Sequence, residues 1–420
     1  MKIVKSEVVA RIAMVMALLA LPGAVRAQTT PTVTGTDDPV YRERLSVYAS
    51  DYSKFVYDPM ERVAGAADWR PLAATAKPAF SPSSLQAVQD YARRMNSSAL
   101  IVWHKGKIAL EWYGDGTGRT SELVSKSLSK PLSAIAVGRA IALGKIASLD
   151  QPISDFIPEL KGTQKGRIHV RHLLDMRSGM QQQTFTTEAD SPLNLGFLSP
   201  DFGHHIIADY PMVAEPGSVY AYANAPADLV AEVIERATGR RYAQFVSDEV
   251  FKPIGALGGA FWDGREGGLA HSGCCMTLPA ETFLRLGVLL LHDGAWHGKR
   301  LLPEGYVTQM HTGTPQNPHF GLGVWVGSPY QKRRGFGAPG APGPQVLHSE
   351  PYLDPDLYLF DGNSDQIVDI SPANDLIVLR MGENPPRPTA ESPQEWDNSY
   401  LVNTLIRGLA AAGKPVPSGK

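Results

Sequence analysis

The sequence has few cysteines and no surplus of either charge. Its 40 lysines and arginines nearly balance 42 aspartates and glutamates, which leaves no basic excess for phosphate contacts, so we expect no nucleic-acid partner. Cys274 and Cys275 are its only two cysteines, and neighbouring cysteines pair only with strain. We therefore expect them to be two small buried apolar residues. No Cys/His spacing typical of a metal site occurs, and we expect neither a metal nor another cofactor.

The N-terminus follows the pattern of a secretory signal peptide. Lys2 and Lys5 precede an apolar stretch over 12–25, and Ala27 provides a small residue for cleavage. The stretch is short for a transmembrane span, although an uncleaved anchor is the alternative interpretation. We predict a signal peptide over 1–27, a periplasmic or secreted protein, and no membrane contact once the signal is removed.

The rest of the chain has strands near both ends and helices in its middle. Apolar residues make up 43% of the sequence, enough for a large core, which excludes disorder as the main state. We predict an N-terminal extension over 28–75 and a domain over 76–415 of the α+β class. In this domain one antiparallel sheet, built from both termini and flanked by helices, carries an inserted, mostly helical region over about 146–300. The predicted elements are a hairpin over 100–113, helices over 127–145, 225–238, 280–292 and 396–412, strands over 320–328, 357–361, 366–371 and 375–381, and an exposed loop over 335–344.

Ser127 and Lys130 are the first candidates for chemistry. On a helix that begins near Ser127, they lie three residues apart on one face. A serine hydroxyl needs a base, and a lysine can serve where burial lowers its pKa. The helix N-terminus adds an amide N–H beside the serine oxygen, which is half of an oxyanion hole. A Ser-x-x-Lys tetrapeptide arises by chance about once in such a chain, so a helix cap and a solvated lysine are the alternative.

Three further phrases follow the tetrapeptide in order. A G-K-(x)n-L-D-x-P phrase spans 144–152, an RHLL…SG phrase spans 168–180, and a PG…Y-x-N phrase lies within 215–242. Together with the tetrapeptide they resemble the superfamily of serine β-lactamases, penicillin-binding proteins and related esterases, over about residues 76–412. The resemblance implies the fold predicted above and a serine nucleophile at Ser127.

The resemblance also assigns roles to Tyr222 and Asn224. Tyr222 has the asparagine of Y-x-N two residues on, whereas Tyr220 has none, so Tyr222 is the expected partner base. Its phenol would relay the Ser127 proton to the leaving group, with a pKa lowered by Lys130. Asn224 would donate a side-chain hydrogen bond to substrate or to Lys130. Because it precedes a proline-containing helix start, an N-cap is its alternative role.

The third motif of the superfamily, Lys-Thr-Gly or His-x-Gly, is replaced. At its expected place before the C-terminal strands the chain reads Asn363-Ser364-Asp365. The positive charge that meets the substrate carboxylate in penicillin-recognising members is therefore missing. We expect the second oxyanion donor to be a backbone N–H near Asp365 or Gln366.

Two segments, 267–303 and 365–382, resemble the branch of 6-aminohexanoate-dimer hydrolases and related esterases. This implies a serine hydrolase that acts on a small amide or ester through an acyl-enzyme on Ser127. The alternatives are a penicillin-recognising D,D-peptidase or β-lactamase, and a binding homologue without turnover. An α/β-hydrolase is not favoured, because no Gly-x-Ser-x-Gly pentapeptide occurs. Oligomeric state cannot be derived from the sequence.

Overall fold

A computed structural model describes residues 35–391 and 393–412. The predicted signal peptide over 1–27 lies outside these residues, so export stays a prediction. In the described ranges, no helix combines the length and the apolar character that crossing a membrane requires.

The main sheet has six strands in the order β3-β2-β14-β13-β12-β9, and every neighbouring pair is antiparallel. Its first two strands come from the N-terminal half of the chain and the other four from the C-terminal part, as predicted. The bounds are β2 Ser97–His104, β3 Lys107–Tyr113, β9 Trp325–Val326, β12 Tyr358–Gly362, β13 Gln366–Ser371 and β14 Leu376–Gly382.

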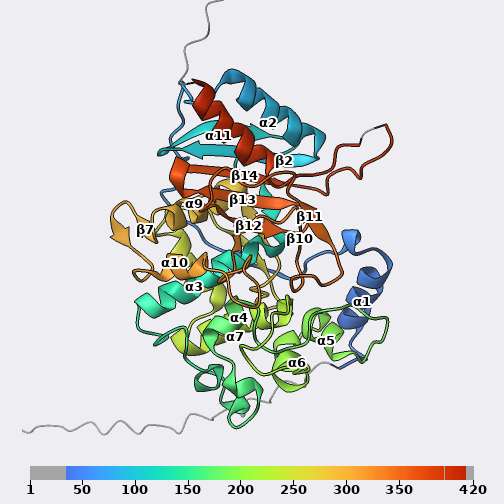
Figure 1. Ribbon diagram of the computed structural model, residues 1–420. Helices are drawn as coiled ribbons and strands as arrows, with labels where there is room; N and C mark the ends of the chain where they lie inside the picture. The colour runs from blue at the N-terminus through green and yellow to red at the C-terminus, as the bar shows by residue number, and fades with distance from the viewer. Residues whose placement is uncertain (1–34, 392, 413–420) are drawn as a thin grey trace, which may run out of the picture. The chain divides into compact units, whose positions relative to one another are not determined.

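The two faces of this sheet are covered by different helices (Figure 1). Helices α2 (Pro82–Arg94) and α11 (Tyr400–Ala412) pack together over one face, and α9 (Ala280–Leu291) covers the other. Alternate residues of β2 serve the two faces: Leu100 and Val102 join the α2–α11 cluster, whereas Ile101 and Trp103 join the cluster with α9. This period-2 burial on both faces explains why the strands are almost continuously apolar.

A second sheet was not predicted. Its four strands run in the order β1-β5-β6-β4, all antiparallel, and they join the N-terminal segment to the middle of the chain. The bounds are β1 Met60–Val63, β4 Glu122–Val124, β5 Gly259–Trp262 and β6 Met276–Pro279. Two short two-stranded ribbons complete the strands: β7 Ala295–Trp296 with β8 Lys299–Arg300, and β10 Arg333–Gly335 with β11 Gln345–Leu347.

The predicted helical region consists mostly of short helices and loops. Its longest helix, α7 (Asn224–Thr238), ends at Gly239, whose φ of 69° is the left-handed conformation expected of a glycine C-cap. It packs against α3 (Ser129–Ala142), the first long helix after the sheet hairpin. The remaining helices are α1 Pro39–Asp51, α4 Val170–Leu174, α5 Pro192–Leu198, α6 Phe202–Ala208, α8 Tyr242–Val246 and α10 Tyr306–Met310.

The strand predicted over 320–328 is mostly wrong. Only Trp325 and Val326 form strand β9, because the chain turns at Gly323, whose φ is +73°. The apolar character of this segment comes instead from burial: Phe320 and Trp325 lie in the core cluster beneath α2 and α11. A short buried loop and a strand can therefore look the same in sequence.

Candidate active site

Ser127 lies in a single 3-10 turn, Lys126–Leu128, that leads directly into α3. Its Oγ is 3.1 Å from the Nζ of Lys130, one helical turn further on. The predicted pairing of these two side chains is thus present in the structure. The turn is placed against the main sheet, where Gly362 of β12 approaches so closely that a Cβ there would lie 3.0 Å from the Ser127 backbone nitrogen.

The ammonium of Lys130 is held by three oxygen atoms in a buried position. Besides Ser127, its Nζ donates to Oδ1 of Asn224 at 2.8 Å and to the carbonyl oxygen of Gly273 at 2.8 Å. Only 3% of the residue is exposed. Burial lowers the pKa of Lys130 to about 7, while the carboxylate of Asp228 acts in the opposite direction. A substantial fraction of neutral amine is therefore present at neutral pH, as a general base requires.

Tyr222 stands beside this pair, with its ring centroid 4.9 Å from Lys130 Nζ. The ring packs among Trp325, Phe320 and Phe336, with centroid distances of 5.9 to 6.1 Å. Our expectation that Lys130 lowers the pKa of Tyr222 is wrong. Burial raises the pKa of this phenol, and the largest effect opposing burial is a hydrogen bond with Ser127. Tyr222 is thus a neutral phenol, able to pass a proton but not a standing phenolate.

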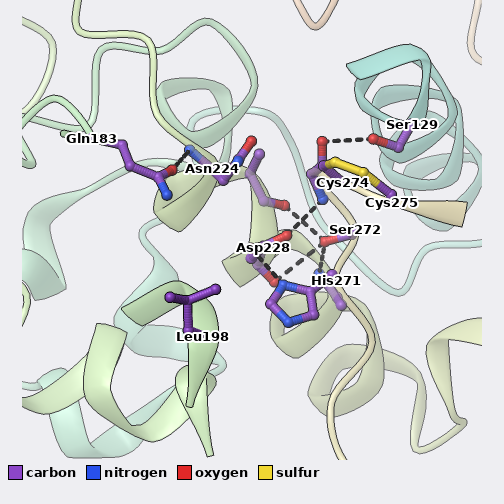
Figure 2. Close-up of polar contacts among 12 residues, drawn as sticks. Ser129, Gln183, Leu198, Asn224, Asp228, His271, Ser272, Cys274 and Cys275 are labelled. Atoms are coloured by element: carbon purple, nitrogen blue, oxygen red, sulfur yellow. Dashed lines mark hydrogen bonds and ion pairs between the residues drawn. A yellow bond between two sulfur atoms is a disulfide. The ribbon is translucent and has the colours of Figure 1, made fainter. Parts of the chain in front are cut away.

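Asn224 is the first residue of α7, and its side chain is turned to Lys130 rather than to the helix. The N-cap is Ala223, and no side-chain cap is present, so the capping role considered for Asn224 is wrong. The Asn224 backbone N–H donates to Oε1 of Gln183 at 3.1 Å (Figure 2). The predicted contact with Lys130 is present, but its direction was wrong: the carboxamide oxygen of Asn224 accepts from the lysine.

The structure does not bring Gln366 to the Ser127 cavity. This residue begins β13 and pairs with Gly362, the last residue of β12. Its carboxamide is engaged with the backbone of Gly382, through bonds of 2.8 and 3.0 Å. Ser364 and Asp365 form the turn between these strands with φ of 67° and 55°. Asn363, the residue before this turn, lines the cavity with Ser127, whereas Asp365 and Gln366 do not.

A cavity of about 390 Å³ opens over Ser127. Its wall consists of aromatic, small and carboxamide side chains, and none of its lining residues carries a charge. They are Ser127, Gln182, Gln183, Phe185, Tyr222, Ala223, Asn224, Phe336, Pro344 and Asn363. Phe336 and Pro344 belong to the loop that we predicted to be exposed, and this loop forms part of the wall.

A positive charge near the third motif comes from Arg334 on another strand, but this charge is paired with Asp361. Arg334 of β10 lies 3.8 Å from the ring of Trp325 and forms a buried ion pair with Asp361 of β12. Sequence reasoning could not find this pair, because the two residues lie on different strands with no motif between them. Asp361 neutralises the charge of this guanidinium, and Arg334 does not line the cavity.

The expectation for the cysteines is also wrong. Cys274 and Cys275 form a disulfide with each other, directly after the Gly273 carbonyl that binds Lys130 (Figure 2). Gly273 itself was missed, because a backbone carbonyl leaves no residue-type signal. The one available signal was its position inside the glycine-rich phrase over 267–303.

Known proteins resemble this chain in sequence. A beta-lactamase family model matches residues 84–347, more than half of the chain. The chain belongs to the beta-lactamase family. Among curated relatives of this hydrolase family, a 6-aminohexanoate-dimer hydrolase from Paenarthrobacter ureafaciens is 24% identical over 52% of this chain and 57% of its own length. Esterase EstB from Burkholderia gladioli is 30% identical over 31% of this chain and 36% of its own length. The chain thus spans less than two thirds of either relative.

Solved structures show the same fold. A Bacillus anthracis protein, provisionally named a 6-aminohexanoate-dimer hydrolase, superposes with a TM-score of 0.66 at 18% identity, covering 90% of this chain and 96% of that one. A penicillin-binding protein from Bacillus halodurans superposes with a TM-score of 0.52 at 18% identity, covering 77% of this chain and 99% of that one. The predicted β-lactamase-like architecture is confirmed.

Proposed function

We propose that this member of the beta-lactamase family is a serine hydrolase that cleaves a small uncharged ester or amide through an acyl-enzyme on Ser127. One observation carries the proposal: the hydroxyl of Ser127 lies 3.1 Å from the buried amine of Lys130, whose pKa is about 7. A lysine in this state accepts a proton at neutral pH and can activate the serine. The names of the curated relatives, a hydrolase and an esterase, support the same reaction class.

The chemistry proceeds in two halves. Ser127 Oγ forms a bond to the substrate carbonyl carbon while Lys130 takes its proton, and the carbonyl electrons move onto oxygen. The tetrahedral intermediate collapses, the bond to the leaving group breaks, and Tyr222 delivers the proton from Lys130 to that group. A water molecule then attacks the acyl carbon while Lys130 and Tyr222 take its proton. The bond to Ser127 Oγ breaks, the proton returns to this oxygen, and the acid is released.

The developing oxyanion requires donors that are in place before the reaction. The backbone N–H of Ser127 is one candidate. The second is the backbone of Asn363, since Gly362 brings the end of β12 against Ser127 and Asn363 lines the cavity. The close approach of Gly362 supports this assignment, because a side chain there would separate the strand from the 3-10 turn.

The cavity supports an uncharged substrate. Its lining residues offer aromatic contact and carboxamide hydrogen bonds, but no cation for a carboxylate. Arg334, the nearest buried guanidinium that the structure shows beside β12, is paired with Asp361. Penicillins carry a carboxylate, so we expect them to be poor substrates.

The test is turnover of p-nitrophenyl acetate and of a neutral acyl anilide by wild type, Ser127→Ala and Ser148→Ala. Ser148 is an exposed serine outside the cavity and provides the matched control. We expect Ser127→Ala to lose at least about 10³-fold in kcat/KM, and Ser148→Ala to match wild type. Equal turnover by wild type and Ser127→Ala would refute the proposal. Rapid turnover of benzylpenicillin would favour the penicillin-recognising alternative.

A further inference from the structure

Residues 271–273 form a short bridge between α7 and α3. On the α7 side, Ser272 Oγ donates to the carbonyl oxygen of Ala227 at 2.7 Å and accepts from the N–H of Ala231 at 3.0 Å. On the α3 side, Ser133 Oγ donates to the carbonyl oxygen of Ser272 at 2.7 Å. The bridge is therefore tied to both helices independently of the candidate catalytic residues.

Gly273 is the point at which this bridge meets the lysine. Its N–H donates to Oδ1 of Asp228 at 2.7 Å, and its carbonyl accepts from Lys130 at 2.8 Å and from Ser129 Oγ at 2.6 Å. A Cβ on Gly273 would lie 2.7 Å from the Cβ of Ala227, so only glycine allows this approach to α7. The hydrogen bond to Asp228 thus holds the residue whose carbonyl binds Lys130.

Asp228 is fixed in turn by His271. Its second carboxylate oxygen lies 3.0 Å from Nδ1 of His271, and both residues are fully buried (Figure 2). The imidazole is stacked between Trp262 and Phe202, with centroid distances of 3.7 and 3.6 Å. Burial lowers the pKa of His271, so the ring is neutral and donates Nδ1–H to the carboxylate. Its Nε2 has no hydrogen-bond partner among the described residues.

We propose that Asp228 and His271 form a positioning pair, which orients the main chain at Gly273 and thereby holds the amine of Lys130 against Ser127. The inference rests on the proposed function, since it assigns a role within the same reaction. Neither residue touches the cavity, and their contact with the reacting groups runs through Gly273.

The pair also brings the negative charge that acts on Lys130. The other side chains around the amine, Ser127, Tyr222 and Asn224, are uncharged. Asp228 raises the proton affinity of Lys130 against the effect of burial. The charges acting on His271 are Asp228 and, more weakly, Arg44 of α1. Removal of the Asp228 charge is therefore expected to make Lys130 more acidic.

Asp228→Asn separates positioning from a merely structural role. The amide oxygen can still accept from Gly273, but the amide NH₂ then faces Nδ1 of His271 and favours the tautomer with its proton on Nε2, which has no hydrogen-bond partner among the described residues. We expect the acid limb of kcat/KM for p-nitrophenyl acetate to move about one pH unit lower. We also expect the plateau to fall about 10-fold. A structural role alone would lower the plateau and leave the limb in place.

His271→Phe and Glu281→Gln complete the experiment. The phenylalanine keeps the aromatic stack and the Asp228 charge but removes the donor, so the plateau falls while the limb does not move lower. Glu281 is a buried carboxylate on α9, paired with Arg285, and its amide variant leaves limb and plateau at wild type. Thermal melting followed by circular dichroism checks each fold. If Asp228→Asn does not fold, His271→Asn decides: its side-chain N–H can replace the lost donor to Asp228, so it should restore the plateau that His271→Phe loses, and a plateau as low as that of His271→Phe would overturn the pair.

The possible results separate the two proposals. A wild-type limb and plateau in both Asp228→Asn and His271→Phe would overturn the positioning pair while leaving the serine hydrolase intact. An unmoved limb in folded Asp228→Asn would overturn the role of its charge. No turnover by the wild type would instead refute the proposed function itself, and the pair with it.

Discussion

Asn224→Asp is the substitution that most directly perturbs the proposed base. The side-chain oxygen of Asn224 lies 2.8 Å from Nζ of Lys130, so the variant places a carboxylate against the amine with almost no change in shape. At an effective dielectric constant of about 20, a charge pair at this distance interacts by about 6 kcal/mol, or about four pKa units. Asp228 already acts in the same direction from further away.

Desolvation of the new carboxylate and partial exposure of position 224 reduce this figure, and we expect a net rise of about one to two pKa units. The pKa of Lys130, about 7 in the wild type, then lies above pH 8. Because only the neutral amine accepts the serine proton, activity at pH 7 falls about 5- to 50-fold and recovers as the pH rises.

The assay is kcat/KM for p-nitrophenyl acetate from pH 5 to 9.5, with spontaneous hydrolysis subtracted. Gln182→Glu is the matched control: it adds a carboxylate to the same cavity wall at an exposed position, where solvent screens the charge. The acid limb of this control stays at the wild-type pH. An Asn224→Asp limb that coincides with the wild-type limb would refute Lys130 as the titrating base.

Two further predictions concern the close approach of Gly362 to Ser127 and the buried carboxyl group of Asp369. Gly362→Ala places a Cβ 3.0 Å from the nitrogen of Ser127, so we expect kcat to fall about 10²-fold with little change in melting temperature; unchanged kcat would contradict the proposal that Gly362 brings Asn363 to the oxyanion. Asp369 of β13 is fully buried, burial raises its pKa, and neither carboxyl oxygen has a hydrogen-bond partner in the described ranges. Asp369→Leu should raise the free energy of unfolding by about 1–3 kcal/mol at pH 7, measured by urea denaturation. Since the unfolded aspartate releases its proton near pH 4, the gain should shrink as the pH falls to that value, and a loss of stability at pH 7 would contradict this reasoning.

The main sheet could be predicted because its signals are local. Its hairpins join strands that are adjacent in sequence. Successive residues of β2 and β14 are buried on opposite faces of the sheet, so both strands are long apolar runs, and turn residues separate them from the next strand. The second sheet has no such signal. Strand β1 has four residues and pairs with β5, about two hundred residues further along the chain. Three- and four-residue strands show too few periods to be distinguished from loops.

The candidate site divides in the same way. Ser127 and Lys130 lie one helical turn apart, so their contact follows from helix geometry, and family phrases led to Tyr222 and Asn224. Gln366 was assigned by its position after the altered motif. The turn at Ser364 and Asp365 places it at the start of β13, whereas Asn363, before the turn, lines the cavity with Ser127.

The backbone contacts that hold Lys130 could not be predicted. Gly273 contributes a backbone carbonyl, and Asp228 acts through a backbone N–H, so neither carries a residue-type signature in the sequence. Such contacts arise from tertiary packing of α3 against α7, which sequence patterns alone do not specify.

Mass spectrometry of the protein after reaction with a fluorophosphonate tests the central claim most directly. The account predicts a single adduct, mapped by peptide digestion to Ser127, which forms faster as the pH rises through about 7 and is absent from Ser127→Ala. An adduct on another serine, or none in a folded protein that hydrolyses p-nitrophenyl acetate, would contradict the account.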